Sequence, residues 1–246
     1  MDPYSMFAPK YDEIIGRDYY PQLKSAILNV LHESPPLTSH LDIGCGTGDL
    51  LAWTSELGFR SEGIDISPNM VKVANTKCLS STAKCVGMMD LENSSWDLIT
   101  ANNDVLNHLV KAHGIKNVFR KLSELVSQRG VILTDAVTGY DILHHWEKCS
   151  HTYTDSMSYK CEVTHEVIST APPIGLMLRQ WYSLENGNWE AALLEEEELL
   201  GISKEDVIIA AESEKLDATL FDWDRRTDTT KKTSRLGIML KKSGGN

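Results

Sequence analysis

Two patterns of hydrophobic and polar positions alternate along residues 22–140. Short apolar runs predict strands, and stretches with apolar residues at helical spacing predict helices. The predicted strands cover residues 41–43, 59–64, 83–86, 96–101 and 131–136. The predicted helices cover residues 22–31, 50–57 and 115–126, with a further one that begins after Ser67-Pro68. Such alternation is typical of a parallel sheet with helices on both faces.

The pattern changes after about residue 139. Residues 160–170 alternate, with Cys161, Val163 and His165 on one side, and further strands are predicted over residues 176–184 and 189–199. Asn186-Gly187 is a hairpin signal between these last two strands. We therefore predict an antiparallel meander inserted into the α/β domain, with the acidic run 195–198 on its exposed side.

The tail returns to the main domain. Ser203 followed by Asp206 predicts a helix start. Residues 219–223 and 236–240 predict two closing strands joined by a polar loop, which favours antiparallel pairing.

Composition narrows the class of protein. The chain has 246 residues and a formal net charge of −11, so a phosphate backbone is a poor partner and we expect no nucleic acid. No apolar run approaches the length of a membrane span, which is about 20 residues. The five cysteines contain no CxxC pair, which disfavours a zinc site or disulfides and favours a cytoplasmic location.

The stretch LDIGCGTGD, residues 41–49, is a buried strand that breaks into a glycine loop at the start of a helix. Bare backbone at such a place lets a ligand approach closely. A dinucleotide loop would carry a third glycine where this chain has Asp49, and Asp49 would face the pyrophosphate. Together with Asp42, this acid argues against NAD and favours a ligand with a cationic part, such as S-adenosylmethionine (SAM).

Other positions suit the remaining parts of SAM. Asp65 ends the second strand and is placed to accept hydrogen bonds from both ribose hydroxyls. Ile66 and Met70 are expected to pack on the adenine, and Asp90 to accept from its exocyclic amine. In the aromatic N-terminal segment, Tyr11 is the best candidate to face the ligand, although packing on the core explains most of those aromatic residues.

These motifs, LDIGCGTGDLL, GIDIS, MMDLE and WDLITANNDVLNHL, together resemble the motif series of class I SAM-dependent methyltransferases. The resemblance implies a Rossmann-like seven-stranded mixed α/β sheet whose last strand is antiparallel. It implies a lid in residues 1–37, a SAM-binding core in 38–140, a substrate-shaping meander in 141–200 and closing elements in 201–246. Within the motifs, we expect further cofactor contacts from Gly44, Cys45, Gly46, Met89, Leu91, Asn102 and Asn103.

In this family the loop after the fourth strand lies beside the transferred methyl group. Methyl transfer depends mainly on proximity and alignment, and a base is needed only if the acceptor must lose a proton. His108 is the first candidate for that base and Asp104 the second. The alternative is that Asp104 and Asn107 cap the turn and the next helix, while His108 bonds to the backbone.

Metal chemistry is not expected. His144 and His145 are adjacent, and adjacent residues rarely ligate one metal, so packing is the preferred explanation. Asp135 and Asp104 could form a metal site like that of catechol methyltransferases. That site would need Asp-Asn after the fifth strand, and this chain has Ala136 and Val137 there instead, so we reject it.

The predicted activity is methyl transfer to N or O of a small molecule, since the DVLNHL segment and the meander resemble glycine- and sugar-N-methylating enzymes. The Asn/Asp-Pro-Pro-aromatic motif of nucleobase methyltransferases is absent. Two alternatives stay open: a protein or tRNA methyltransferase, and a SAM-binding regulator without catalysis.

Overall fold

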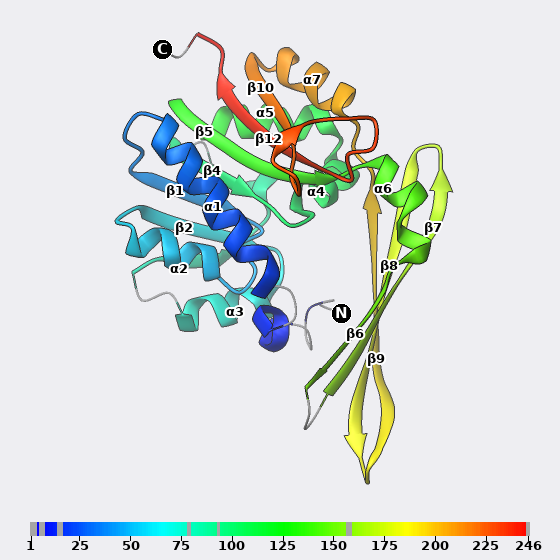
Figure 1. The fold of residues 1–246 in the computed structure, drawn as a ribbon. Helices are drawn as coiled ribbons and strands as arrows, with labels where there is room; N and C mark the ends of the chain where they lie inside the picture. The colour runs from blue at the N-terminus through cyan, green and yellow to red at the C-terminus, as the bar shows by residue number, and fades with distance from the viewer. Residues whose placement is uncertain are drawn as a thin grey trace.

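In a computed structural model, which describes residues 4, 8–13, 17–77, 80–92, 94–155 and 159–244, a large mixed sheet carries helices on both faces. A four-stranded antiparallel sheet extends from one side of it as a long arm (Figure 1). The strand order in the large sheet is β11-β10-β12-β5-β4-β1-β2-β3. The class predicted from the sequence is confirmed, with one difference: β11 adds an eighth strand to the seven predicted.

The strands of the large sheet are β1 (Ser39–Ile43), β2 (Arg60–Asp65), β3 (Thr82–Cys85), β4 (Trp96–Ala101), β5 (Val126–Val137), β10 (Leu216–Asp222), β11 (Thr227–Asp228) and β12 (Arg235–Lys242). Strands β1 to β5 pair in parallel, and β12 pairs antiparallel with both β5 and β10. The antiparallel last strand is therefore as predicted.

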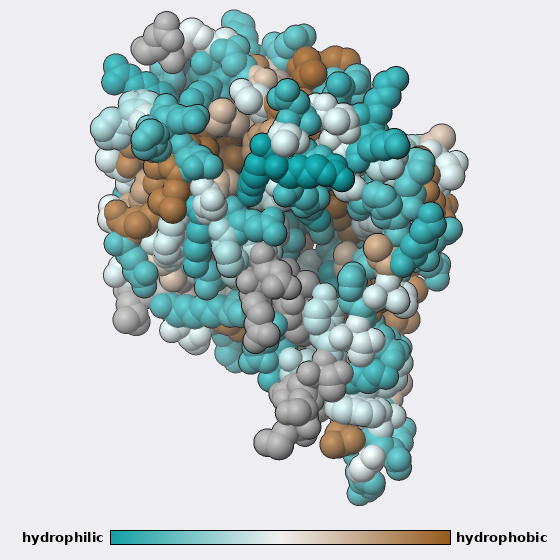
Figure 2. Space-filling model, in the orientation of Figure 1, coloured by the Kyte–Doolittle hydropathy of each residue, from teal (hydrophilic) through white to brown (hydrophobic). Residues whose placement is uncertain are grey.

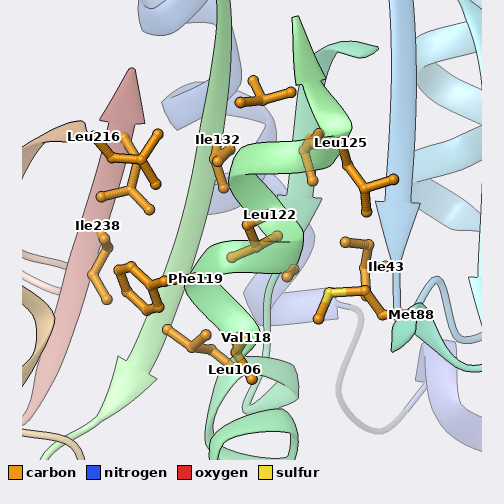
Figure 3. Packing of buried hydrophobic residues seen from close by; sticks show 14 of the residues in the cluster. Ile43, Met88, Leu106, Val118, Phe119, Leu122, Leu125, Ile132, Leu216 and Ile238 are labelled. Carbon is orange, nitrogen blue, oxygen red and sulfur yellow. The ribbon is translucent and has the colours of Figure 1, made fainter. Parts of the chain in front are cut away.

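Helices α1 (Arg17–Glu33), α2 (Asp49–Glu56) and α3 (Pro68–Lys77) cover one face of this sheet, and α4 (Val105–His113), α5 (Ile115–Leu125) and α7 (Lys204–Ser213) cover the other. Figure 3 shows the core on the second face, where Phe119 and Leu122 of α5 point at Ile132 of β5 and Ile238 of β12. The helical spacing of apolar residues in 115–126 thus reflects burial against the sheet. Three short elements complete the main domain: η1 (Ala8–Lys10), η3 (Met88–Asp90) and α6 (Gly139–His144).

The meander consists of β6 (Ser150–Asp155), β7 (Tyr159–Thr170), β8 (Pro173–Glu185) and β9 (Asn188–Leu200), and η4 (Trp146–Lys148) leads into it. The sequence predicted three of these strands and missed β6, whose residues are mostly polar. Asn186 and Gly187 form the predicted hairpin turn, both with positive φ.

Helix α4 is a further element that the sequence did not predict as such. It begins directly after Asp104, and it buries Leu106 and Val110, four residues apart, in the main core. His108 consequently lies on a helix rather than in a loop.

Figure 2 shows that the face seen there is mainly hydrophilic, with hydrophobic atoms in separate small groups. Among the described residues, no helix is long and apolar enough to cross a membrane.

Candidate cofactor and acceptor cavity

A cavity of about 770 Å³ lies where the carboxyl ends of β1, β2 and β4 meet the meander. Ligands in open α/β folds bind at this end of the strands. Its lining comes from the glycine loop, the segments after β2, β3 and β4, helix α4, the meander, Arg235 of β12 and two N-terminal tyrosines. The cavity thus joins the predicted cofactor loop to the predicted acceptor side in one space.

The glycine loop presents bare backbone to this cavity. Gly44 has φ +67° and Gly46 has φ +53°, and both line the cavity. A Cβ added at Gly44 would lie 2.3 Å from a methyl of Val105, whereas one at Gly46 would meet no atom of the described residues within 4 Å. Gly44 is therefore needed for packing against α4, and Gly46 leaves space on the ligand side.

Asp65 is fixed between two backbone amides. One carboxylate oxygen accepts from the Gly46 N–H at 2.9 Å, and the other accepts from the Ser67 N–H at 2.8 Å. Each oxygen can accept more than one hydrogen bond, so a diol can still bind to the oriented carboxylate. Next to it, Ile66 is 76% exposed although it is apolar, and it lines the cavity; Met70 lines it as well.

Asp42 does not lie at the cavity surface. Its side chain accepts from the Thr100 hydroxyl at 2.6 Å inside the sheet, and burial raises its pKa to about 7. Asp49 pairs with Lys24 at 2.8 Å, also outside the lining. The argument that these two acids place negative charge beside the ligand is therefore wrong: Asp42 is partly neutral near pH 7, and Lys24 compensates Asp49.

Replacing Asp42 with asparagine should change how stability depends on pH. Because the pKa of Asp42 is raised from 3.8 to about 7 in the folded state, wild-type protein loses stability as pH rises through that window. The asparagine side chain does not titrate, and its oxygen can still accept from Thr100. We expect the variant to gain about 2 kcal/mol over wild type between about pH 5 and about pH 8 in urea unfolding. Parallel curves for the two proteins would contradict the buried acid.

The segment after β3 contacts the cavity through different residues from those predicted. Val86, Gly87 and Met88 line it. The predicted contacts Met89, Asp90 and Leu91 follow them along η3 and lie outside the lining, with Asp90 exposed. Cys45 is also outside it, with its side chain packed beneath the loop against α2 and α3.

The loop after β4 is held by an ionic network. Asn103 and Asp104 have positive φ, and the Asn103 N–H donates to Asp135 at 2.8 Å. Arg235 of β12 bridges Asp104, at 2.8 Å, and Asp135. Asp135 thus belongs to an ion pair through which β12 holds the loop. No sequence motif had indicated Arg235.

Asn102 supplies an unsatisfied polar atom on this side. It is only 7% exposed, lines the cavity, and its side-chain oxygen has no hydrogen-bond partner among the described residues. Such a buried acceptor is satisfied when a ligand donor arrives.

The N-terminal segment contributes two tyrosines to the lining. Tyr11 accepts a hydrogen bond from the Asn103 side chain, and Tyr4 donates to Glu197 at 3.2 Å. Tyr11 thus lies in the cavity lining, and that it faces the ligand stays a prediction. Of the predicted lid, residues 4, 8–13 and 17–37 are described.

His108 faces the meander and forms an ion pair with Glu197. Burial alone would lower the pKa of His108, but the hydrogen bond and the charge of Glu197 outweigh burial, so the pKa is raised. Glu197 also pairs with Arg179, which is 7% exposed. Burial opposes the charge of Glu197, yet Arg179 and His108 together lower its pKa to about 2.

The acidic run 195–198 is therefore only half exposed, which corrects the sequence prediction. Glu195 and Glu197 point inward, and Glu196 and Glu198 point outward. Successive side chains of a strand face opposite sides, so Glu195 and Glu197 share one face of β9. On that face Glu197 pairs with Arg179, and the indole of Trp181 donates to Glu195 at 2.8 Å.

Cross-strand neighbours define the inner face of the meander. His165 of β7 is opposite Met177 of β8, which is opposite Glu197 of β9. In the adjacent row, His151 of β6, Val163 and Arg179 follow one another. The alternation of residues 160–170 had predicted the shared face of Val163 and His165, whereas the cavity-lining position of Arg179 had no signal in the sequence.

His144 and His145 lie outside this cavity. His144 bonds to the Tyr140 carbonyl at 2.9 Å, and His145 bonds to Asp141 at 2.8 Å. Within the described ranges, no cluster of three or more His, Cys, Asp and Glu residues is placed to hold a metal ion.

Comparisons with known proteins agree with this geometry. Residues 41–130 match the model of a methyltransferase domain family. A relative from Geobacillus sp. (strain WCH70), named as a methyltransferase, is 29% identical over 159 residues, which cover 62% of this chain and 64% of the relative. One from Bacillus subtilis (strain 168), also named as a methyltransferase, is 28% identical over 144 residues, which cover 56% of this chain and 57% of the relative. The matches thus span less than two thirds of these curated relatives.

Solved structures match over nearly the whole chain. A SAM-dependent methyltransferase from Clostridium acetobutylicum ATCC 824 has a TM-score of 0.83 at 22% identity, with coverage of 98% of this chain and 99% of that one. The sugar N-methyltransferase KedS8 from Streptoalloteichus sp. ATCC 53650 has a TM-score of 0.77 at 15% identity, with coverage of 98% and 93%. At these identities the likeness shows the fold, meander included. Residues 41–130 are thus similar to a methyltransferase domain, and the chain has the fold of solved SAM-dependent methyltransferases.

Proposed function

We propose that this protein transfers a methyl group from SAM to a nitrogen or oxygen of a small molecule. The observation that carries the proposal is the single cavity in which the glycine loop and Asp65 face the ionic wall of His108, Glu197 and Arg179. Both halves of a two-substrate reaction can be accommodated in that space.

The residues of the cofactor half fit SAM. Asp65, oriented by two amides, suits a ribose diol, and the exposed Ile66 suits the face of an adenine ring. The unsatisfied oxygen of Asn102 suits a donor such as an ammonium group. When bound, SAM supplies an electrophilic methyl on a sulfonium; the chain's own residues hold the partners in line and exclude water.

The acceptor half favours a small molecule. Its wall is formed by the inner face of the meander together with α4, and its charged side chains are paired with one another rather than arranged as a basic groove. The net charge of −11 also disfavours a polyanionic substrate. KedS8 is named as a sugar N-methyltransferase and has the same fold, which supports an acceptor of comparable size.

Calorimetric titration with S-adenosylhomocysteine (SAH) tests the cofactor half. We expect binding tighter than millimolar, and we expect Ile66→Asn to weaken it several-fold because a polar side chain packs poorly on adenine. Leu57→Asn is the matched control, since Leu57 is also apolar and 46% exposed but lies outside the cavity. No measurable affinity in wild type would refute the proposal. Turnover of SAM with a panel of primary amines and phenols would separate an enzyme from a non-catalytic binder.

A further inference from the structure

His165 lies on the meander wall of the cavity, and its Nδ1 is 3.0 Å from the carbonyl oxygen of Cys149. A carbonyl only accepts hydrogen bonds, so Nδ1 must carry the hydrogen. In the neutral ring, Nε2 then carries the lone pair. The backbone of the segment before β6 thereby selects the tautomer of a histidine that lines the cavity.

The surroundings of His165 favour the neutral form of its ring. Burial lowers its pKa, which outweighs the opposite effect of the Cys149 carbonyl, and the charges of His151 and Arg179 lower it further. Asp104, across the cavity, is the charge that favours the protonated form. Glu197 lies in the same row but two strands away, beyond Met177, and it is already paired with Arg179 and His108. The edge of the ring packs against Trp146 at a centroid distance of 4.9 Å, which limits its rotation.

His108 differs in each of these respects. Its Nε2 is engaged by Glu197, and the ion pair favours the protonated ring. A ring that is already protonated cannot take up a further proton. His108 therefore favours the protonated form and has its Nε2 engaged by Glu197, whereas His165 favours the neutral form and has its Nδ1 held by the Cys149 carbonyl.

We propose that Nε2 of His165 accepts the proton that the methyl acceptor loses, an inference that rests on the proposed function. In the step, a lone pair of the acceptor nitrogen or oxygen forms a bond to the methyl carbon, and the carbon–sulfur bond breaks with its electron pair going to sulfur. The proton on the acceptor atom moves to Nε2, and the imidazolium then releases it to solvent. The acceptor class follows: the methylated atom carries a hydrogen, as in a primary or secondary amine or a hydroxyl, unlike a tertiary amine.

Two variants isolate this role. His165→Asn retains a donor at the place of Nδ1 for the Cys149 carbonyl but removes Nε2. His144→Asn is the matched control, because His144 makes the same Nδ1-to-carbonyl bond, to Tyr140 at 2.9 Å, outside the cavity. We expect His165→Asn to lower kcat by about 10²- to 10⁴-fold and to remove the acidic limb of the rate–pH profile. We expect SAH affinity within about twofold of wild type, since a base is not a cofactor ligand.

Nuclear magnetic resonance of ¹⁵N-histidine-labelled wild-type protein gives a readout that needs no acceptor. His165 should show the Nδ1–H tautomer near neutral pH and titrate below His108. An Nε2–H tautomer, a protonated ring at that pH, or full turnover by His165→Asn would overturn the inference. Absence of SAH binding or of any methylated product in wild type would instead refute the proposed function. The nuclear magnetic resonance spectrum would still report the tautomer of His165 in that case.

Discussion

Replacing Asp65 with alanine is expected to weaken the binding of SAH by about 2 kcal/mol, which is roughly 30-fold in Kd. The reason is twofold. The variant loses charge-assisted hydrogen bonds to the ribose hydroxyls, and it also releases the amides of Gly46 and Ser67, which the carboxylate holds at 2.9 and 2.8 Å. The glycine loop and the start of α3 then lose their common support, so the cost includes reorganisation of the site. Isothermal titration calorimetry with SAH measures it directly.

Glu62→Ala is the control for this substitution. Glu62 lies on the same strand, but its carboxylate pairs with Lys84 at 2.7 Å and lies outside the cavity, so its removal should leave SAH affinity unchanged. Thermal unfolding of both variants would verify that they are folded. If Asp65→Ala bound SAH as wild type does, the ribose assignment would be wrong.

Replacing Glu197 with alanine is expected to destabilise the protein by about 3–5 kcal/mol, because it removes the carboxylate that pairs with buried Arg179 and with partly exposed His108. Arg179 is 7% exposed, and His108 shares the same partner. Urea unfolding near neutral pH measures the loss. Glu196→Ala, which removes an exposed carboxylate from the neighbouring position, should stay within about 0.5 kcal/mol of wild type.

The pH dependence of this difference has a definite sign. The pKa of Glu197 is lowered from 4.5 to about 2, so its stabilising contribution is present above the unfolded-state value and is lost as pH falls through that window. The gap between wild type and Glu197→Ala should therefore narrow on acidification below about pH 4.5. A gap that stays constant, or a small loss near neutral pH, would show that the three charges are solvated rather than buried.

Much of the fold was predictable because local pattern and burial coincide. In β4 and α5, apolar residues recur at the periods of a strand and a helix, and these same residues fill the core. The start of α3 was predictable from local residues alone. The Ser67 hydroxyl caps the helix by accepting from the Met70 N–H at 3.1 Å, and Pro68 is the first helical residue. Strand β6 was missed because its polar residues carry no apolar alternation.

The placement of the glycine loop and of Asp65 at the cavity was predictable, because backbone geometry determines it. Gly44, Gly46 and Asp65 act through positions that a strand–loop–helix sequence determines. Asp42 was misjudged because a residue's neighbours on adjacent strands decide whether its side chain faces a ligand or Thr100. Such neighbours are separated by 58 positions in the chain, and a single sequence does not reveal them.

The acceptor half was the least predictable for the same reason. Arg179 and Glu197 share one face only because β8 and β9 pair in one register, and a shift of β9 by one residue would turn Glu197 to the opposite face from Arg179. The tautomer of His165 is assigned by its contact with the Cys149 carbonyl, which lies 16 positions away in the chain. His108 was recognised from its motif, but its charge state depends on a strand that follows much later.

The position of β12 has a consequence for biosynthesis. This strand fills the gap between β5 and β10, although both are translated before it, so a nascent chain carries two open strand edges until residues 235–242 leave the ribosome. The same strand delivers Arg235 to Asp104 and Asp135, which orders the loop at the centre of the cavity. The cavity is therefore completed only when residues 235–242 have been translated, and a chain that stops before residue 235 would lack the cation that holds the loop after β4.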